Sequence, residues 1–464
     1  MLDKTQKKGS TKHKKKNAFF CFVLTYSYLC HQNKTSMKHI WTLAAALLLL
    51  SSCNKSDDDN TEKKDTIGDR TVVVYMSGEN NLSALTNSDI EEMTAGAKNL
   101  PDSKRLIVFV DRADSRKKPF IARINSSSTT SRIDTLYQYP EDFYASSADR
   151  FYEVLQRATQ LAPAKEYGLV LWGHANGWFI ESDSVKTELR RAYGVDNGNN
   201  TTNGGQPKWL NIPSMRLALE KLGIDWQFVF ADCCNMMCAE VGYELRNVTR
   251  YFIGSPAEIP GSGAPYHELV PVFFMSGNSL CHGIVDNYFN HYKNVYSQKP
   301  QIDVNGVSVP EELSGHSVPL TVFDTQYAEP LARVTRDVVA KIAATHSELP
   351  DLAEIPYYLD VVSPVMYDMK AFIRHYAPES DYQSWLAVFS QAVPYSHASL
   401  RWMTIYESLY NAFGSFSRDE SVYGCISMYI PQDLPGYNAG SSQYNKTAEN
   451  MEWNRVIGWS QYGW

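Results

Sequence analysis

The sequence is poor in cysteine, with eight in 464 residues. Cys21 and Cys30 precede a predicted export signal, so six cysteines would remain in a processed chain, and five free thiols if Cys53 is lipidated. An odd count does not make a disulfide framework, and no histidine spacing near the cysteines matches a zinc site. Cys233, Cys234 and Cys238 lie too close together in the sequence for disulfides among them to stabilise a fold, which favours a thiol kept reduced for chemistry.

Long hydrophobic runs are also missing. The apolar run Ile40–Leu50 has eleven residues, whereas a membrane-spanning helix needs about 20. With 44% hydrophobic and 20% charged residues, the composition is that of a globular protein and excludes a multi-span membrane protein.

Positive charge is scarce in the body of the chain. The formal net charge is -7, but the first 52 residues hold nine basic groups and one acidic group. From Cys53 onward, 35 basic and 50 acidic groups leave a net charge of -15. Such a chain has no electrostatic drive toward a phosphate backbone, so we expect no nucleic-acid partner.

The short apolar run has the features of an export signal. Met37-Lys38-His39 supplies the charged start, Ile40–Leu50 the apolar centre, and Leu50-Ser51-Ser52-Cys53 resembles a bacterial lipobox. We therefore predict a lipoprotein signal peptide over residues 37–52 and lipidation of Cys53; the alternative is a cleaved signal with an incidental cysteine. Residues 1–36 do not fit ahead of such a signal, and we expect them to be an untranslated upstream extension.

Residues 53–69 read as an acidic tether that includes Asp57-Asp58-Asp59. Acidic residues just after a lipidated cysteine resemble the surface-export signal of Bacteroidetes lipoproteins. The expected location is the cell envelope, with the chain lipid-anchored to the outer membrane and open to the cell surface.

The body alternates buried-strand and helix patterns, which predicts an α/β fold with a parallel sheet and crossover helices. The helices are expected at Ser147–Leu161 and Ile212–Leu222. The strands are continuously apolar, as strands buried on both faces are: Val72–Met76, Leu106–Val110, Gly168–Trp172 and Phe228–Ala231. Tyr193–Pro207, rich in Asn and Gly, is expected to be an inserted, protease-sensitive loop.

The second half of the chain repeats this pattern and is expected either to continue the sheet or to add a smaller α/β subdomain. The predicted elements are strand Leu320–Phe323, helices Tyr327–His346 and Asp381–Val393, and strands Leu400–Ile405 and Cys425–Ile430.

Reactive residues follow the predicted strands, where active groups of parallel sheets lie. His174 follows one strand and Cys234 the next, so one crossover brings an imidazole and a thiol to the same sheet edge. A nucleophilic cysteine needs such a base. Glu79 and Asp111, also at strand ends, are expected to be loop or cap residues.

Two segments carry a specific resemblance. LVLWGHANGW (Leu169–Trp178) and FADCCNMMCAE (Phe230–Glu240) closely resemble the His and Cys motifs of the clostripain-like cysteine peptidases, relatives of caspases, gingipains and legumain. Four further segments extend the likeness over most of residues 71–431: Val72–Leu82, Gly254–Tyr266, Tyr367–Ile373 and Gly424–Pro431. The resemblance implies a caspase-like α/β/α sandwich with a mostly parallel central sheet, a catalytic core at 70–265 and a C-terminal α/β part at 266–464.

The same resemblance implies a cysteine endopeptidase that works through a His174/Cys234 dyad and a thioester. It makes Asp232 the acidic residue two before the nucleophile and leaves Cys233 as a spacer; Cys233 as nucleophile and a Cys233–Cys234 disulfide are the alternatives. The amides of Ala175 and Cys234 would form the oxyanion hole, although the family usually has Gly where this chain has Ala175.

Specificity is also implied by the family. Its members cleave after Arg or Lys because acidic residues line the S1 pocket, a role that falls here to Asp232 and Glu258, while Ser262 stands where Asp is expected. The expected partners are protein or peptide substrates and a membrane through the lipid anchor. No cofactor or metal site is expected, His267 and His282 lie outside any motif, and calcium dependence is known among relatives. The alternative function is a catalytically inactive, peptidase-like surface lipoprotein that binds proteins or glycans.

Overall fold

The structure is a computed structural model, and it places most of the chain from residue 67 onward. It describes residues 67–114, 116–125, 133–179, 192–198, 205–304, 307–310, 318–346, 348–360, 364–399, 402–405, 409–410, 420–432 and 447–463. The chain divides into two compact units, Met1–Lys63 and Lys64–Trp464, and every described residue belongs to the second. The predicted signal peptide, Cys53 and nearly all of the tether lie outside the described residues.

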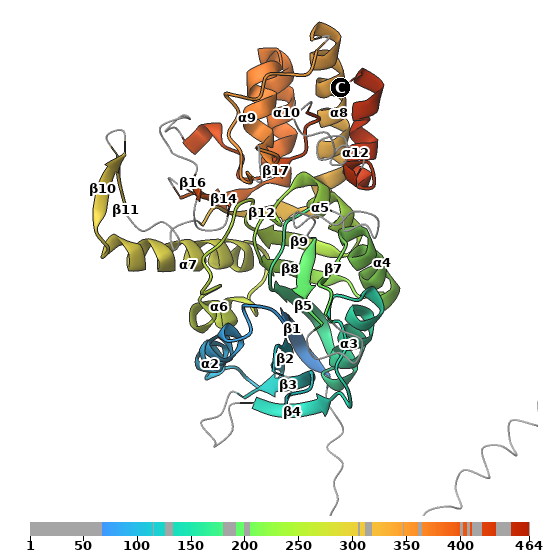
Figure 1. Cartoon of the computed structure of the whole chain (residues 1–464), viewed down its shortest axis with the longest axis vertical. Helices are drawn as coiled ribbons and strands as arrows, with labels where there is room; N and C mark the ends of the chain where they lie inside the picture. The colour runs from blue at the N-terminus through green and yellow to red at the C-terminus, as the bar shows by residue number, and fades with distance from the viewer. Residues whose placement is uncertain are drawn as a thin grey trace, which may run out of the picture. The chain divides into compact units, whose positions relative to one another are not determined.

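One large sheet organises the described part of the chain (Figure 1). Its five central neighbours β9, β8, β5, β1 and β2 run parallel, and antiparallel strands extend both edges. In spatial order the nine strands formed by described residues are β14 (Tyr395–His397), β12 (Leu320–Asp324), β9 (Thr249–Gly254), β8 (Trp226–Asp232), β5 (Ala164–Trp172), β1 (Gly68–Gly78), β2 (Lys104–Arg112), β3 (Phe120–Ile124) and β4 (Ile133–Gln138).

The four strands predicted in the first half of the chain are confirmed as β1, β2, β5 and β8. Val74 in β1 pairs with Val108 on one side and Val170 on the other, and all three are fully buried. β-Branched side chains fill both faces of these strands because helices cover both faces. The observed strands extend beyond the predicted apolar runs, since the polar residues at their ends also pair.

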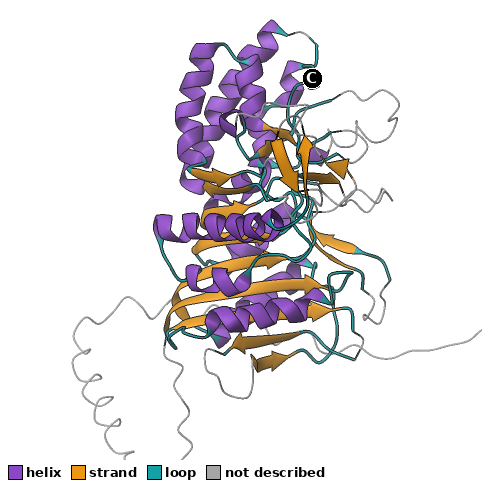
Figure 2. Cartoon of the chain, turned by 90° about the vertical axis from the view of Figure 1, so that its left-hand side faces the viewer, coloured by secondary structure: helices purple, strands orange, loops and turns teal. Residues whose placement is uncertain are grey.

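Helices form a layer on each side of the sheet, which confirms the predicted α/β/α arrangement. One layer packs α2 against α6 and α6 against α7. This layer consists of α2 (Leu85–Ala97), α6 (Tyr266–Val272) and α7 (Gly277–Ser297). The opposite side holds α3 (Ala148–Leu161), α4 (Ile212–Leu222), α5 (Ala239–Glu244), α8 (Ala328–Thr345), α9 (Met369–Tyr376), α10 (Glu379–Ala392) and α12 (Glu452–Ile457). Figure 1 shows α2, α6 and α7 on one side of the strands and α3 and α4 on the other, and Figure 2 looks onto the first of these layers.

Short elements complete the fold. The 3₁₀ turns are η1 (Leu245–Asn247), η2 (Thr325–Tyr327), η3 (Glu420–Val422) and η4 (Trp459–Tyr462). The two-stranded sheets are β6 (Tyr193–Asp196) with β7 (Lys208–Leu210), β10 (Gln301–Val304) with β11 (Val307–Pro310), β13 (Tyr367–Asp368) with β17 (Ser427–Met428), and β15 (Met403–Ile405) with β16 (Leu409–Tyr410).

Two details differ from the sequence-based expectations. The strands expected at Leu400–Ile405 and Cys425–Ile430 form the short β15 and β17, which pair outside the large sheet. Tyr193–Pro207 does not begin as a loop, because β6 is fully buried and the Tyr193 hydroxyl donates to backbone oxygens of β1 and β5. Among described residues, no helix combines the length and apolar character needed to cross a membrane.

Candidate active site

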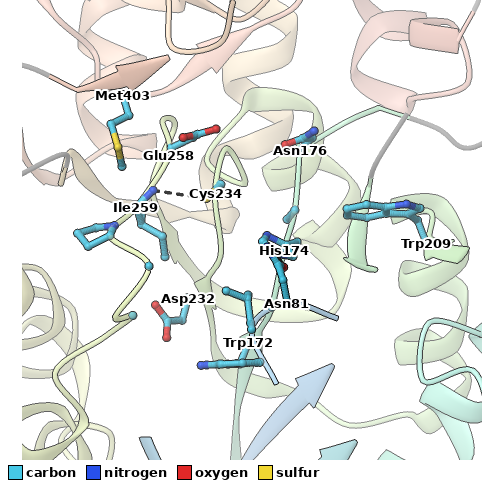
Figure 3. Close-up of a pocket in the computed structure, with 16 residues that line it drawn as sticks. Asn81, Trp172, His174, Asn176, Trp209, Asp232, Cys234, Glu258, Ile259 and Met403 are labelled. Carbon is cyan, nitrogen blue, oxygen red and sulfur yellow. Dashed lines mark hydrogen bonds between the residues drawn. The ribbon is translucent and has the colours of Figure 1, made fainter. Parts of the chain in front are cut away.

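A pocket of about 390 Å³ opens where the carboxyl ends of β1, β5 and β8 meet (Figure 3). The strand order puts β5 between β1 and β8, so the residues that follow these strands converge on one edge. The pocket is lined by Asn81, Leu82, Trp172, Gly173, His174, Ala175, Asn176, Trp209, Asp232, Cys234, Glu258, Ile259, Pro260, Gly261, Gly263 and Met403.

The two adjacent thiols have different surroundings. Cys234 lines the pocket and is half-buried, whereas Cys233 is 1% exposed and its Sγ donates to the carbonyl of Leu171 at 3.0 Å. Both are free thiols, so the vicinal disulfide is absent from the structure. Of the two, only Cys234 presents its sulfur to the pocket, while Cys233 belongs to the hydrophobic core.

The Cys234 thiol is held in its protonated form. Burial raises its pKa strongly, and the negative charges of Glu258 and Asp232 raise it further. A hydrogen bond from the Ile259 amide to Sγ, at 3.5 Å, acts in the opposite direction. A base that removes the proton during attack is therefore needed for this sulfur to act as a nucleophile.

His174 supplies an imidazole on the same pocket, and Figure 3 shows its ring and Cys234 on two neighbouring strand ends. Its Nε2 lies 2.6 Å from Oδ1 of Asn81, on the loop that follows β1. Gly173, which precedes His174, has a φ of +145° and lies very close to β1. A Cβ atom at position 173 would be only 3.0 Å from the carbonyl oxygen of Ser77, so glycine is favoured there. Asn81 was missed from sequence because an Asn in a polar loop carries no distinctive signal.

Ala175 also lines the pocket, directly after His174. It does not take a positive φ, and it forms an isolated antiparallel bridge with Tyr193. The backbone of this loop is fixed by bonds from Gly194 N to His174 O at 2.7 Å and from Asn176 N to Ala192 O at 2.9 Å. Replacement of the usual Gly by Ala therefore imposes no backbone strain here.

Asp232, the last residue of β8, lines the pocket with a carboxyl group that is 4% exposed. Oδ2 accepts hydrogen bonds from the Tyr266 hydroxyl at 2.8 Å and the Ala264 amide at 3.2 Å. Oδ1 accepts no hydrogen bond of normal geometry from the described residues. Burial raises the pKa of Asp232 to about 6, against the lowering effect of the two donors, so the group is mainly ionised at neutral pH.

Asp89, on α2, is a second buried carboxyl beside Asp232 that the sequence did not reveal. Trp172 Nε1 donates to its Oδ2 at 2.6 Å, and a Cβ on Gly263 would lie within 4 Å of both Asp89 and Asp232. Burial, followed by the charge of Asp232, raises the pKa of Asp89 to about 8. In the sequence, Asp89 stands out only as one acidic residue on the apolar face of a helix. Such residues are also common in ordinary surface helices, so this pattern does not identify a buried carboxyl group.

Glu258 lines the pocket from the loop after β9, as the sequence predicted, and its negative charge raises the pKa of the Cys234 thiol. Ser262 points elsewhere, since its hydroxyl lies 2.9 Å from the hydroxyl of Tyr292 on α7. The pocket wall thus carries the carboxylates of Asp232 and Glu258, with Asp89 behind it.

Glu79 and Asp111, expected to be loop or cap residues, instead belong to a largely buried carboxylate cluster with Asp142 and Asp196. Asp111 is 1% exposed, and neither of its carboxylate oxygens accepts a hydrogen bond from a described residue. Burial, and then the charges of Asp196, Glu79 and Asp142, raise its pKa well above the usual range. Closely placed carboxylate oxygens are the ligands that a hard cation such as Ca²⁺ takes, so Glu79, Asp111 and Asp142 could hold one.

The fold and this pocket define a cysteine peptidase with a caspase-like α/β fold, and comparisons with known proteins agree. The clostripain family profile matches residues 74–462, so the chain belongs to the clostripain family. A secreted C11 cysteine protease from Bacteroides thetaiotaomicron, solved with an irreversible peptide inhibitor, is 26% identical with a TM-score of 0.67, covering 85% of this chain and all (100%) of that one.

Two more distant structures share the fold. An inactive zymogen C11 protease from Parabacteroides distasonis is 22% identical with a TM-score of 0.63, over 84% of this chain and 99% of that one. The secreted C11 protease iotapain from B. thetaiotaomicron is 16% identical with a TM-score of 0.61, again over 84% and 99%. No curated protein matches the chain. The predicted family, fold class and enzyme class are therefore confirmed.

Proposed function

We propose that the chain is an endopeptidase that cleaves after Arg or Lys, with Cys234 as nucleophile and His174 as the proton carrier. The observation that carries the proposal is the buried carboxylate of Asp232, which shares one pocket with the pocket-facing thiol and the imidazole. A cationic P1 side chain would give the unsatisfied Oδ1 of Asp232 a charged donor.

The proposed reaction has two steps. Cys234 Sγ bonds to the scissile carbonyl carbon while His174 takes the thiol proton, and backbone amides at Ala175 and Cys234 stabilise the oxyanion. The C–N bond then breaks and His174 returns the proton to the leaving amine, which leaves a thioester. Water, deprotonated by His174, attacks the thioester and releases the acid product and the thiol.

Substrate charge is proposed to help activate the thiol. In the free enzyme the charges of Glu258 and Asp232 raise the pKa of Cys234. A P1 guanidinium or ammonium bound beside these carboxylates would offset both charges and lower that pKa. A basic P1 residue would thus contribute to the chemical step as well as to binding.

The experiment is a panel of fluorogenic peptides that differ only at P1, assayed with wild type and Cys234→Ala. A charge-assisted hydrogen bond worth about 1.5–3 kcal/mol corresponds to a preference of about 10- to 100-fold in kcat/KM. We expect Arg and Lys peptides to exceed Ala and Leu peptides by that factor, with no turnover by Cys234→Ala. Equal cleavage after Ala, Leu and Arg would contradict the specificity and leave the peptidase class intact.

We also propose that the protein is a lipid-anchored component of the cell envelope. The support is the sequence Leu50-Ser51-Ser52-Cys53 after an apolar run, followed by the acidic tether. Cys53→Ser is expected to move the protein from the membrane fraction to the soluble fraction, and to remove labelling by a fatty-acid probe. Unchanged membrane partition of Cys53→Ser would show that the tetrad is incidental. The thiol and imidazole that line the pocket favour an active peptidase over the alternative of a catalytically inactive, binding lipoprotein.

A further inference from the structure

A second group of potential metal ligands lies behind the pocket, on the helical layer formed by α2, α6 and α7. His267 and Glu268 begin α6, His291 lies on α7, and one ligand atom from each lies within 4.8 Å of the others. His267 Nε2 lies 3.4 Å from Glu268 Oε1, and His291 Nδ1 lies 3.1 Å from the same oxygen. The three side chains are 25–40% exposed, so solvent ions reach them.

These separations suit a small metal ion. Ligand atoms bound tetrahedrally to zinc at about 2.0–2.1 Å lie about 3.3 Å from one another, close to the two distances in the cluster. The third separation, between the two imidazoles, is at most 4.8 Å, so a shift of one imidazole would allow one ion to sit between Glu268 Oε1 and the two imidazole nitrogens.

Glu92, on α2, prepares His267 for this role. Its Oε2 lies 3.3 Å from His267 Nδ1 and is fixed by the Tyr266 amide at 3.0 Å. When neutral His267 donates its Nδ1–H to Glu92, its Nε2 carries a lone pair that faces the carboxylate oxygen Oε1 of Glu268. Two hydrogen-bond acceptors then lie opposite each other, which is unfavourable. A proton or a metal ion between these two atoms would remove the repulsion. A carboxylate that orients a histidine in this way is the usual outer partner of a metal-bound imidazole.

We propose that His267, Glu268 and His291 form a binding site for a borderline transition-metal ion of the Zn²⁺ type, with Glu92 as the orienting carboxylate. Two imidazole nitrogens and one carboxylate oxygen favour Zn²⁺, Co²⁺ or Ni²⁺ over Ca²⁺ or Mg²⁺, which take oxygen ligands. Three protein ligands leave a fourth position for water.

The site connects structurally to the floor of the pocket. Tyr266, next to His267, donates its hydroxyl to Asp232 Oδ2 at 2.8 Å. Tyr292, next to His291, donates its hydroxyl to the carbonyl of Gly263. A bound ion would join α6 to α7 directly behind these two tyrosines and so stabilise the wall that holds Asp232. The existence of the site does not depend on the proposed peptide specificity.

The test uses the tag-free full chain in the Cys234→Ala background, so that the catalytic thiol and imidazole do not form a competing site. Zn²⁺ is titrated by calorimetry, and Co²⁺ by the visible absorption of tetrahedral coordination. We expect one ion per chain and a higher Tm with Zn²⁺ than without it.

Single variants separate this site from other binding. His291→Ala and His267→Ala should each weaken Zn²⁺ binding at least tenfold, and Glu92→Gln should weaken it less while the ion count stays the same. His282→Ala is the matched control, because His282 lies on the same helix but stacks on Tyr395, at 3.7 Å between ring centroids, outside the cluster. The proposal is overturned if Cys234→Ala binds no Zn²⁺, or if His267→Ala and His291→Ala bind it as tightly as the His282→Ala control.

Discussion

The Nε2 atom of His174 lies 2.6 Å from Oδ1 of Asn81, so a loop after β1 orients the imidazole that follows β5. An acceptor oxygen at Nε2 favours the tautomer with the proton on that nitrogen, which leaves Nδ1 as the basic nitrogen. In the proposed mechanism Asn81 would thereby select the nitrogen that receives the thiol proton, as the orienting residue of a catalytic triad does.

Asn81→Ala is predicted to lower kcat by about 10- to 100-fold, the effect of losing one hydrogen bond to a charged imidazolium. KM should change little, because Asn81 acts on the ring rather than on the substrate. Asn81→Asp is the control: it keeps the acceptor, adds a charge, and should shift the acidic limb of the pH–rate profile upward by stabilising the imidazolium. An unchanged kcat in Asn81→Ala would rule out this positioning role.

The preference for a basic P1 residue is predicted to depend on pH through Asp232. Burial raises its pKa to about 6, so the carboxyl is protonated below that pH and ionised above it. The ratio of kcat/KM for a P1 Arg peptide over its neutral isostere, citrulline, should therefore rise between about pH 5 and 7. In Asp232→Asn the ratio should be low and flat. A ratio that does not vary with pH in wild type would exclude Asp232 as the charged partner.

Glu258 is predicted to suppress the reactivity of the free enzyme, because its charge raises the pKa of Cys234. Glu258→Gln should therefore react faster with iodoacetamide, measured without substrate, through a larger thiolate fraction. The same variant should lose part of its preference for Arg over citrulline. Glu91→Gln, at an exposed position on α2, serves as a control for general charge effects. Slower alkylation of Glu258→Gln would contradict the electrostatic account.

The fold was largely predictable because the central strands are continuously apolar, and such runs form buried parallel strands whatever their partners. Val72–Met76 and Gly168–Trp172 were identified on that basis. The antiparallel orientation of the edge strands β12 and β14 was harder to predict, because the direction of a strand depends on how the connecting segment returns the chain to the sheet. β6 was missed, since Gly194 and Gly198 in an Asn/Gly-rich stretch predict a loop, whereas contacts with β1 determine its conformation.

The motif residues of the pocket could be predicted from the sequence, but the residues that contact them could not. His174, Asp232 and Cys234 follow predicted strands, so topology alone brings them to one edge. Asn81 and Asp89 act through contacts made across the sheet, and neither has a local pattern that distinguishes it from a loop or surface residue. Such long-range partners require the three-dimensional structure.

The buried carboxylate cluster makes a prediction about stability. The folded-state pKa of Asp111 is raised above its unfolded value, so folding favours the protonated acid and stability falls as pH rises above about 4. In EDTA, Asp111→Asn should have a Tm higher by about 2 °C or more at neutral pH, and the gap should widen between pH 5 and 8. The amide introduced by Asp111→Asn carries no charge at any pH and can donate its N–H groups to the neighbouring carboxylates, so folding no longer requires proton uptake at this position.

Calcium provides the companion measurement. If the cluster holds Ca²⁺, then adding Ca²⁺ should raise the Tm of wild type and have little effect on Asp111→Asn. A Tm of Asp111→Asn at or below that of wild type in EDTA, at every pH, would show that the carboxylates are not a source of instability.

The most direct measurement is the site of covalent labelling by an irreversible inhibitor that mimics a basic P1 residue. Wild type, Cys233→Ala, Cys234→Ala and His174→Ala are treated with a peptidyl chloromethyl ketone ending in Arg, and the modified residue is located by fragment-ion mass spectrometry. The account predicts one label on Cys234 in wild type and Cys233→Ala, and no label in Cys234→Ala. His174→Ala should be labelled far more slowly, because its thiol stays protonated. Labelling of Cys233, or undiminished labelling of Cys234→Ala, would contradict the assignment of the nucleophile.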